Sequence, residues 1–214
     1  MSDALVRRCG LVCFVVGLVG AALALLLLAW PTEVDDALLR YPFSEAGFLT
    51  VQAVFAAHHL GLVAGVVALS LSGVVGRGRA ARGGAWLLVA GTVMLTASEL
   101  LTMRYVAWTN EAAYGGLMGA AYGISCTVIG LGAILAGIGV RRARVWSGWR
   151  AWTPMVIGVA QFVMVTPGMF GGFVLARLVI GAWMLMFAAL GWSLYAEAKE
   201  RAAPRSGSRA VAVG

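Results

Sequence analysis

Apolar runs of about 20 residues, separated by short polar segments, are the feature that most constrains the fold of this chain. At a rise of about 1.5 Å per residue, such a run crosses a hydrocarbon core of about 30 Å. Backbone groups in lipid must be hydrogen-bonded within their own segment, so each run is expected to be an α-helix. The predicted spans are residues 9–30, 44–75, 85–103, 114–140, 151–166 and 173–197. The sequence therefore predicts an all-α, polytopic integral membrane protein, a bundle of six transmembrane helices.

The composition agrees with lipid as the main solvent. Of the 214 residues, 61% are hydrophobic and 12% are charged, whereas a soluble domain carries about 25% charged residues. The net charge of +7 comes from arginines in short loops between apolar runs, which is a membrane-topology signal. We therefore expect the lipid bilayer, and no nucleic acid, as the partner. The richness in arginine, alanine, glycine and valine is typical of GC-rich bacterial genes, so the expected location is the bacterial inner membrane.

The positions of the basic residues predict the topology. Basic segments precede the first span and follow the second, fourth and sixth spans, which places all of them on one side of a six-span protein. Because basic loops stay in the cytoplasm, both termini are expected there. These residues are Arg7 and Arg8; Arg77, Arg79 and Arg82; Arg141, Arg142, Arg144 and Arg150; and Lys199, Arg201, Arg205 and Arg209.

The sequence also predicts the structure of the two ends of the chain. The first apolar run, 10–30, is longer than the 7–15 residues of a signal-peptide core, so it is interpreted as an uncleaved span. Residues 1–197 are predicted to form one transmembrane domain. Residues 198–214 are rich in basic and small residues and are predicted to be a disordered basic tail.

Five polar side chains inside the apolar spans form the predicted ligand-binding site. Gln52 and His59 lie seven residues apart on one stripe of the second span, and Glu99 lies in the third. Gln161 and Arg177 come from the fifth and sixth spans. By helical rise, His59 and Gln161 lie near the middle of the membrane, with Glu99 about 6 Å and Arg177 about 12 Å toward the outer side. This asymmetry predicts an outward-facing polar pocket.

A structural role for the same residues is the main alternative. A carboxylate in lipid must be paired or protonated, so Glu99 is expected to face the bundle interior. An ion pair with Arg177, or hydrogen bonds to histidine or threonine, would satisfy Glu99 without any ligand. The two histidines, His58 and His59, are adjacent on one helix and cannot supply both axial ligands of a haem. A zinc site needs three or four ligands, so we expect neither a metal site nor another cofactor.

A glycine stripe marks the fourth span. Gly115, Gly119 and Gly123 recur at four-residue spacing, and small residues at this spacing let helix backbones approach closely. The stripe is interpreted as a packing face inside the bundle. The alternative is a contact with a second copy, giving a homodimer, or with a partner membrane protein.

A short motif opens the second span. Residues 42–47 read PFSEAG, and Ser44 is predicted to cap the helix that follows. This motif resembles the signature at the start of the second span in a family of uncharacterised six-span bacterial membrane proteins, classed only as a domain of unknown function. The order of spans and the basic second loop are similar over about residues 12–195. Tyr114 stands where that family's pattern has a histidine. The resemblance implies a six-helix architecture and no established activity.

Three functions remain open on these observations. The first is a transporter-like or small-ligand-binding protein that uses the outward-facing pocket. The second is a non-catalytic accessory or scaffold subunit that interacts through the glycine stripe. The third is an intramembrane enzyme acting on a lipid or quinone, with His59 as base and Glu99 as its partner. The sequence has no HExxH, C-x-x-C or G-x-S-x-G motif, so the enzyme is the less favoured.

Overall fold

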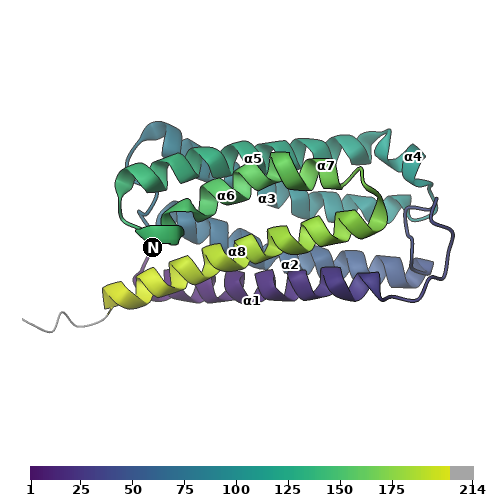
Figure 1. Ribbon diagram of the computed structural model, residues 1–214, viewed down its shortest axis with the longest axis horizontal. Helices are drawn as coiled ribbons and strands as arrows, with labels where there is room; N and C mark the ends of the chain where they lie inside the picture. The colour runs from purple at the N-terminus through teal and green to yellow at the C-terminus, as the bar shows by residue number, and fades with distance from the viewer. Residues whose placement is uncertain (203–214) are drawn as a thin grey trace, which may run out of the picture.

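The structure, a computed structural model, describes residues 1–202 and is a bundle of long helices (Figure 1). Six of its helices are long and apolar enough to cross a membrane, as the sequence predicts. They are α1 (Asp3–Leu28), α2 (Glu45–Leu71), α3 (Arg79–Thr102), α5 (Leu117–Ala143), a composite helix (Gly148–Gly168) and α8 (Gly172–Ala202). The composite helix consists of η2 (Gly148–Trp152), α6 (Thr153–Ala160), η3 (Gln161–Val165) and α7 (Thr166–Gly168). Two short elements, η1 (Met103–Tyr105) and α4 (Asn110–Tyr114), connect α3 to α5.

The helix ends differ from the predicted spans because local capping and side-chain pairs move them. Ser2 caps α1 by accepting a hydrogen bond from the backbone N–H of Leu5, so the helix starts before its apolar run. At the other end, α8 continues through Ala202, where Arg201 forms an ion pair of 2.8 Å with Glu197 one turn earlier. The predicted tail, 198–214, is thus helical over its first residues, and its remainder lies outside the described residues.

Glycines set the closest helix contacts of the bundle. α1 runs antiparallel to α8, and a Cβ atom added to Gly17 would lie 2.6 Å from the backbone nitrogen of Ala188. α3 packs on α5 equally tightly, because a Cβ atom on Gly132 would lie 2.4 Å from the nitrogen of Leu88. A side chain at either glycine would force the two backbones apart.

The predicted glycine stripe does not make these contacts. α5 begins only at Leu117, so Gly115 lies in the turn before the helix and its Cβ position faces the Glu111 carbonyl. Gly119 faces the backbone of Tyr114, and nothing lies within 4 Å of the Cβ position of Gly123. Within the described residues, the packing role therefore belongs to other glycines.

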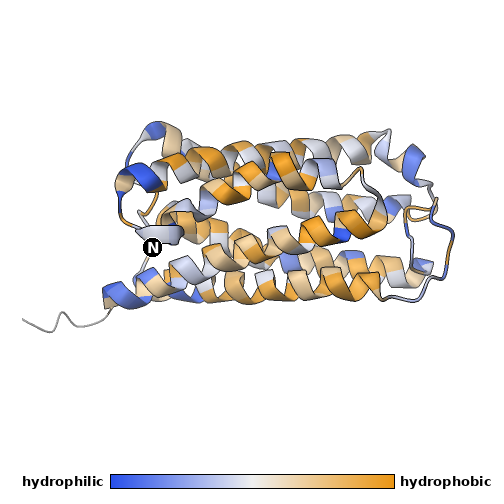
Figure 2. Cartoon of the chain, in the orientation of Figure 1, coloured by the Kyte–Doolittle hydropathy of each residue, from blue (hydrophilic) through white to orange (hydrophobic). Residues whose placement is uncertain are grey.

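Hydropathy and aromatic residues divide the bundle into an apolar body and two polar ends (Figure 2). The start of α1 and the end of α8 lie at the same end, which also carries the basic loops and is called the basic end below (Figure 1). Exposed tryptophans lie near both ends: Trp86, Trp149 and Trp152 near the basic end, Trp30 and Trp108 near the other, the distal end. Such belts are typical of membrane–water interfaces.

Two interlocked connections cover the distal end. The backbone N–H of Leu39 donates to the Trp108 carbonyl at 3.0 Å, and that of Asn110 donates to the Ala37 carbonyl at 2.8 Å. Beneath them is a second apolar core, made of Leu27, Leu39, Phe43, Phe48, Ala113 and Met118. The distal half of the bundle is therefore covered by ordered loops and apolar side chains, whereas the sequence predicted an outward-facing polar pocket.

Candidate functional site

Glu99 is the centre of a polar cluster in the distal half of the bundle. It lies near the end of α3 and is buried. The hydroxyl of Tyr122, from α5, donates a hydrogen bond of 2.9 Å to Oε2 of Glu99. The Tyr122 oxygen also lies 3.0 Å from the hydroxyl of Thr102, one turn beyond Glu99. α3 and α5 are thus joined by a polar chain inside the bundle.

Arg177 lies beside this cluster without forming an ion pair. Arg177, from α8, is within electrostatic range of Tyr114, Glu99 and Tyr122. Its guanidinium carbon is 4.9 Å from the centroid of the Phe173 ring. The ion pairs among residues 1–202 both lie at the basic end. The direct Glu99–Arg177 pair, which the sequence offered as a structural alternative, is therefore not formed, and the carboxylate is bonded to tyrosine instead.

Gln161 lies where the fifth membrane-crossing helix is interrupted. The segment Gln161–Val165 is a π-helix, and the N–H of Thr166 bonds to the Gln161 carbonyl, five residues back. The interruption precedes Pro167, which has no backbone N–H for a regular α-helical bond. The Gln161 side chain, 1% exposed, donates from Nε2 to the Thr166 hydroxyl at 3.3 Å. Short π-segments are frequent at functional sites.

Cys126 connects Gln161 to the Glu99 cluster. It lies on α5, one turn after Tyr122, against the side chain of Gln161 and within electrostatic range of Glu99. Three helices and the interrupted segment therefore contribute polar side chains to one region of the bundle.

The two adjacent histidines of α2 have different surroundings. The ring of His58 donates from Nε2 to the backbone carbonyl of Val16 on α1. A Cβ atom on Gly20 would lie 2.6 Å from that nitrogen, so Gly20 leaves space for the ring. His58 thus ties α1 to α2. The ring of His59 bonds through Nδ1 to the carbonyl of Phe55 at 2.8 Å. Because a carbonyl only accepts, the proton is on Nδ1 and the Nε2 lone pair of His59 is free of that bond.

The structure brings together only part of the predicted site. Glu99, Gln161 and Arg177 belong to one region, linked by neighbouring side chains. Gln52 and His59 are buried on α2, and within residues 1–202 no hydrogen bond joins either of them to Glu99. In the same described part of the chain, no group of three His, Cys, Asp or Glu residues is arranged to hold a metal ion.

Two members of the cluster were missed by the sequence analysis. Tyr122 and Cys126 were not placed in the predicted site, although both lie in the predicted fourth span. Tyr122 left a usable signal, because a tyrosine deep in an apolar span needs a partner for its hydroxyl group. Cys126 gave no such signal in the sequence, since a buried cysteine is usually a small apolar packing residue.

The helices and the cluster define a class, an all-helical protein with six helices long and apolar enough to cross a membrane and with polar side chains inside its bundle. Comparison of the chain with protein-family models, with curated proteins and with solved structures found no match. The resemblance of residues 42–47 to a family signature therefore stays a prediction.

Proposed function

We propose that this chain is a transporter-like or ligand-binding membrane protein that holds a small polar molecule in the distal half of its bundle. The observation that carries the proposal is a set of buried polar atoms with no hydrogen-bond partner. Within residues 1–202 three of them belong to the predicted site: Gln52 Oε1, Gln161 Oε1 and Arg177 Nε. The other two, in Arg40 and Trp146, lie near the two ends of the bundle.

The energetic cost of these atoms favours a ligand. Each buried polar group that lacks a partner costs about 1–3 kcal/mol, and in lipid the surroundings supply no replacement. A bound molecule would remove the cost at Gln161 and Arg177, which lie in one region, if it offers an N–H or O–H donor to Gln161 and an acceptor to Arg177. The ligand class is therefore a small molecule that carries both hydrogen-bond donors and an acceptor or anionic group.

The interrupted helix supports the same proposal. Irregular backbone at membrane depth is tolerated where it is buried in protein or lines a cavity. In many transporters, substrates bind beside discontinuous helices near the middle of the membrane. Gln161 occupies the first position of the π-helical segment. Its side chain is thus placed where a ligand would meet the interruption.

We propose that the basic end lies in the cytoplasm of a bacterial cell and the distal end faces outward across the inner membrane. The arginine-rich loops support this orientation. A ligand from outside would then enter past the two hydrogen-bonded connections, Leu39 with Trp108 and Asn110 with Ala37. These two connections would have to separate for each binding event.

A thermal-shift panel of polar metabolites tests the proposal. Amino acids, carboxylates, sugars and small amines would be added at millimolar concentration to the purified protein in detergent. At least one is expected to raise the melting temperature of the wild type, and Gln161→Leu should abolish that rise. Thr127→Val is the matched control, because Thr127 is exposed on α5 and bonds only to its own helix. Equal responses of wild type and Gln161→Leu would contradict the site.

A scaffold role is the second candidate, and one observation favours it. Gly123 has open space around it, and small residues continue on the exposed side of α5. These are Ala120, Gly123 and Thr127. In lipid such a face suits close contact with another helix, from a second copy or a partner. Gly123→Leu should then lower the mass of the complex in light scattering; an unchanged mass would contradict this role.

The intramembrane-enzyme hypothesis gains no support from the site. Among residues 1–202, the one hydrogen bond of the His59 ring goes to the Phe55 carbonyl, and no serine or tyrosine hydroxyl is bonded to it. A base needs such a contact with the group it deprotonates, or a substrate in its place.

A further inference from the structure

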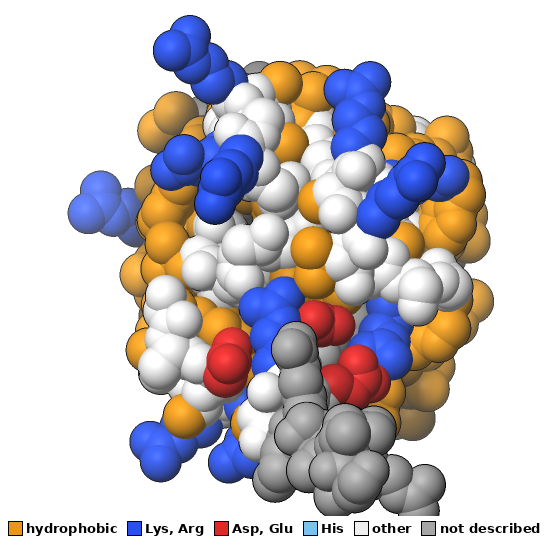
Figure 3. All heavy atoms as spheres, turned by 90° about the vertical axis from the view of Figure 1, so that its left-hand side faces the viewer, with side chains coloured by type: hydrophobic (Ala, Val, Ile, Leu, Met, Phe, Trp, Pro, Cys, Tyr) orange, Lys and Arg blue, Asp and Glu red, His pale blue; other side chains and the backbone are white. Residues whose placement is uncertain are grey.

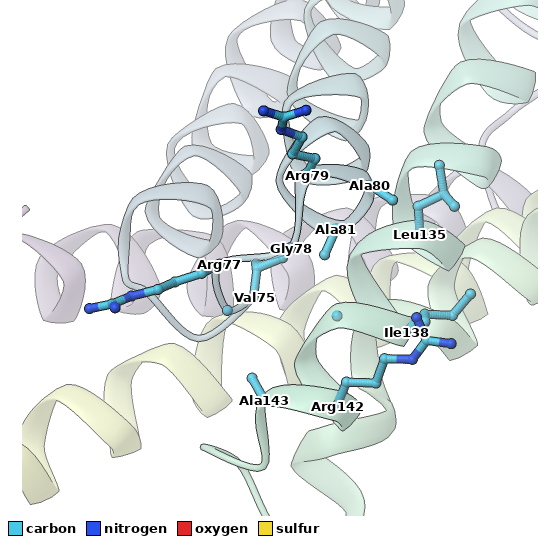
Figure 4. Close-up of a pocket in the computed structure, with 12 residues that line it drawn as sticks. Val75, Arg77, Gly78, Arg79, Ala80, Ala81, Leu135, Ile138, Arg142 and Ala143 are labelled. Atoms are coloured by element: carbon cyan, nitrogen blue, oxygen red, sulfur yellow. The ribbon is translucent and has the colours of Figure 1, made fainter.

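A cavity of about 430 Å³ opens at the basic end, far from the Glu99 cluster (Figure 4). It lies between the α2–α3 connection and the last turns of α5. Its lining consists of residues 75–81 together with Leu135, Ile138, Gly139, Arg142 and Ala143. This volume is within the range of about 300–1,000 Å³ that small-molecule sites occupy.

The rim of this cavity is cationic and uncompensated. Arg77, Arg79 and Arg142 line it, and in the described part of the chain none of the three forms an ion pair. Figure 4 shows their side chains leaving the rim in different directions, so no contact between them holds the guanidinium groups in place. Each is an exposed arginine with a long flexible stem, free to turn toward an anion.

The start of α3 adds backbone donors to the same rim. Gly78 is the N-cap of α3 and has no side chain to cap the first turn, and that turn contains no acidic residue. The residues that follow it, Arg79, Ala80 and Ala81, all line the cavity. Free N–H groups at the start of a long helix favour an anion. Cationic side chains and helix donors thus meet at one opening.

The wall of the cavity is apolar. Val75 is buried within the α2–α3 connection, and Leu135 and Ile138 come from α5. Leu135 is an exposed large apolar residue. One opening therefore combines a cationic rim with an apolar wall, which matches a molecule with an anionic head and a hydrocarbon chain.

The arginine rim lies at the level expected for lipid headgroups, so the surrounding membrane is the expected source of such a molecule. Trp86 lies two turns beyond Arg79 on α3 and is 47% exposed, as expected for a side chain at the headgroup level. Figure 3 looks onto the basic end and shows Lys and Arg side chains spread around it, with the Asp and Glu side chains grouped in the lower half of the view. Glu197 and Glu200, near the end of α8, are already paired with arginines.

We propose that this cavity binds an anionic phospholipid, with the headgroup phosphate at the arginine rim and an acyl chain against the wall of α5. A zwitterionic lipid would leave the rim charge uncompensated, because its own ammonium group would be brought to the arginines. Basic pockets at the cytoplasmic surface of helix bundles suit anionic headgroups for the same electrostatic reason. The proposal is independent of the ligand site around Glu99.

The test compares lipids of one acyl composition. Phosphatidylglycerol or phosphatidylcholine is titrated into the full-length protein in detergent, and the melting temperature and lipid retention in native mass spectrometry are recorded. Phosphatidylglycerol should raise the melting temperature and stay bound, while phosphatidylcholine should do neither. One arginine near an anionic surface contributes about fivefold in affinity, so Arg79→Gln with Arg142→Gln should weaken binding by about 25-fold. Arg7→Gln with Arg8→Gln is the matched control and should retain binding within about twofold.

A second variant separates lipid binding from folding. Ala80→Glu places a carboxylate in the first turn of α3, where it interacts favourably with the helix dipole. The variant should melt no lower than the wild type without lipid, yet lose the phosphatidylglycerol shift by repelling the phosphate. The proposal is overturned if phosphatidylcholine binds equally well, if the control pair loses binding as much as the rim pair, or if Ala80→Glu keeps the full shift. An equal shift from inorganic phosphate alone would also overturn it, by showing a free-anion site.

Discussion

The bond between Glu99 and Tyr122 carries the sharpest prediction about the interior of the bundle. The Tyr122 hydroxyl donates to the carboxylate at 2.9 Å in a buried setting. Tyr122→Phe leaves Glu99 without this donor, and Glu99→Leu leaves the hydroxyl without this acceptor. Leaving one buried partner unsatisfied costs about 1–3 kcal/mol, whereas replacing both partners by apolar groups is close to neutral.

The prediction is a coupling free energy of about 1–3 kcal/mol between the two sites. For a chain of this size, about 1 kcal/mol corresponds to about 2–4 °C, so each single variant should melt about 2–12 °C lower than the wild type. The double variant should recover most of the loss. The assay is a double-mutant cycle by thermal unfolding in detergent, read by circular dichroism.

A parallel cycle replaces Tyr122→Phe with Arg177→Met. No ion pair joins Arg177 to Glu99 in the described residues, so its coupling to Glu99→Leu should be smaller than that of Tyr122. A buried ion pair would instead cost about 3–5 kcal/mol on losing one partner. A coupling of that size to Arg177, with little coupling to Tyr122, would refute the assignment of tyrosine as the partner of the carboxylate.

Three further predictions concern packing, the unpartnered amide and the topology. Gly20→Ala would place a Cβ atom 2.6 Å from Nε2 of His58, and it should lower the free energy of unfolding by about 1–3 kcal/mol in thermal melts. Gly123→Ala, in open space, should be neutral or stabilising. Equal effects of the two substitutions would contradict the contact between Gly20 and His58. Gln161→Leu removes a buried oxygen that has no partner together with the bond from Nε2 to Thr166, so without ligand it should melt within about two degrees of the wild type, and a drop of several degrees would show that the oxygen is satisfied. Reporter fusions in the α2–α3 connection should read cytoplasmic and those in the α1–α2 connection periplasmic; the reverse result would overturn the proposed orientation.

Helix positions were predictable because each rests on local chemistry. The apolar runs alone required helices of membrane length, and the structure has six. Ser44 was predicted to cap the second span, and its hydroxyl accepts from the backbone N–H of Gly47 at 3.3 Å. Shifts at other ends also have local causes, such as the cap at Ser2 and the Glu197–Arg201 pair. Such causes involve residues that are neighbours in the sequence, so they can be identified without the tertiary structure.

Contacts between helices could not be read in this way. Each residue turns a helix face by about 100°, so a small change in rotation or depth selects another partner. Glu99 has both Arg177 and Tyr122 nearby, and only the packing of α3 against α5 decides that it bonds to Tyr122. The glycine spacing had the same weakness, because the pattern does not say that the helix starts at Leu117.

The sequence by itself thus determined the six long apolar helices and the identity of the few polar groups within them. The tertiary structure decided which of those groups are satisfied. Burial makes an unpartnered polar atom costly, but whether an atom finds a partner depends on side chains distant in the sequence. Glu99 found one in Tyr122, while Oε1 of Gln52 and Oε1 of Gln161 did not. That difference, invisible in the sequence, is what separates a packed membrane bundle from a candidate binding site.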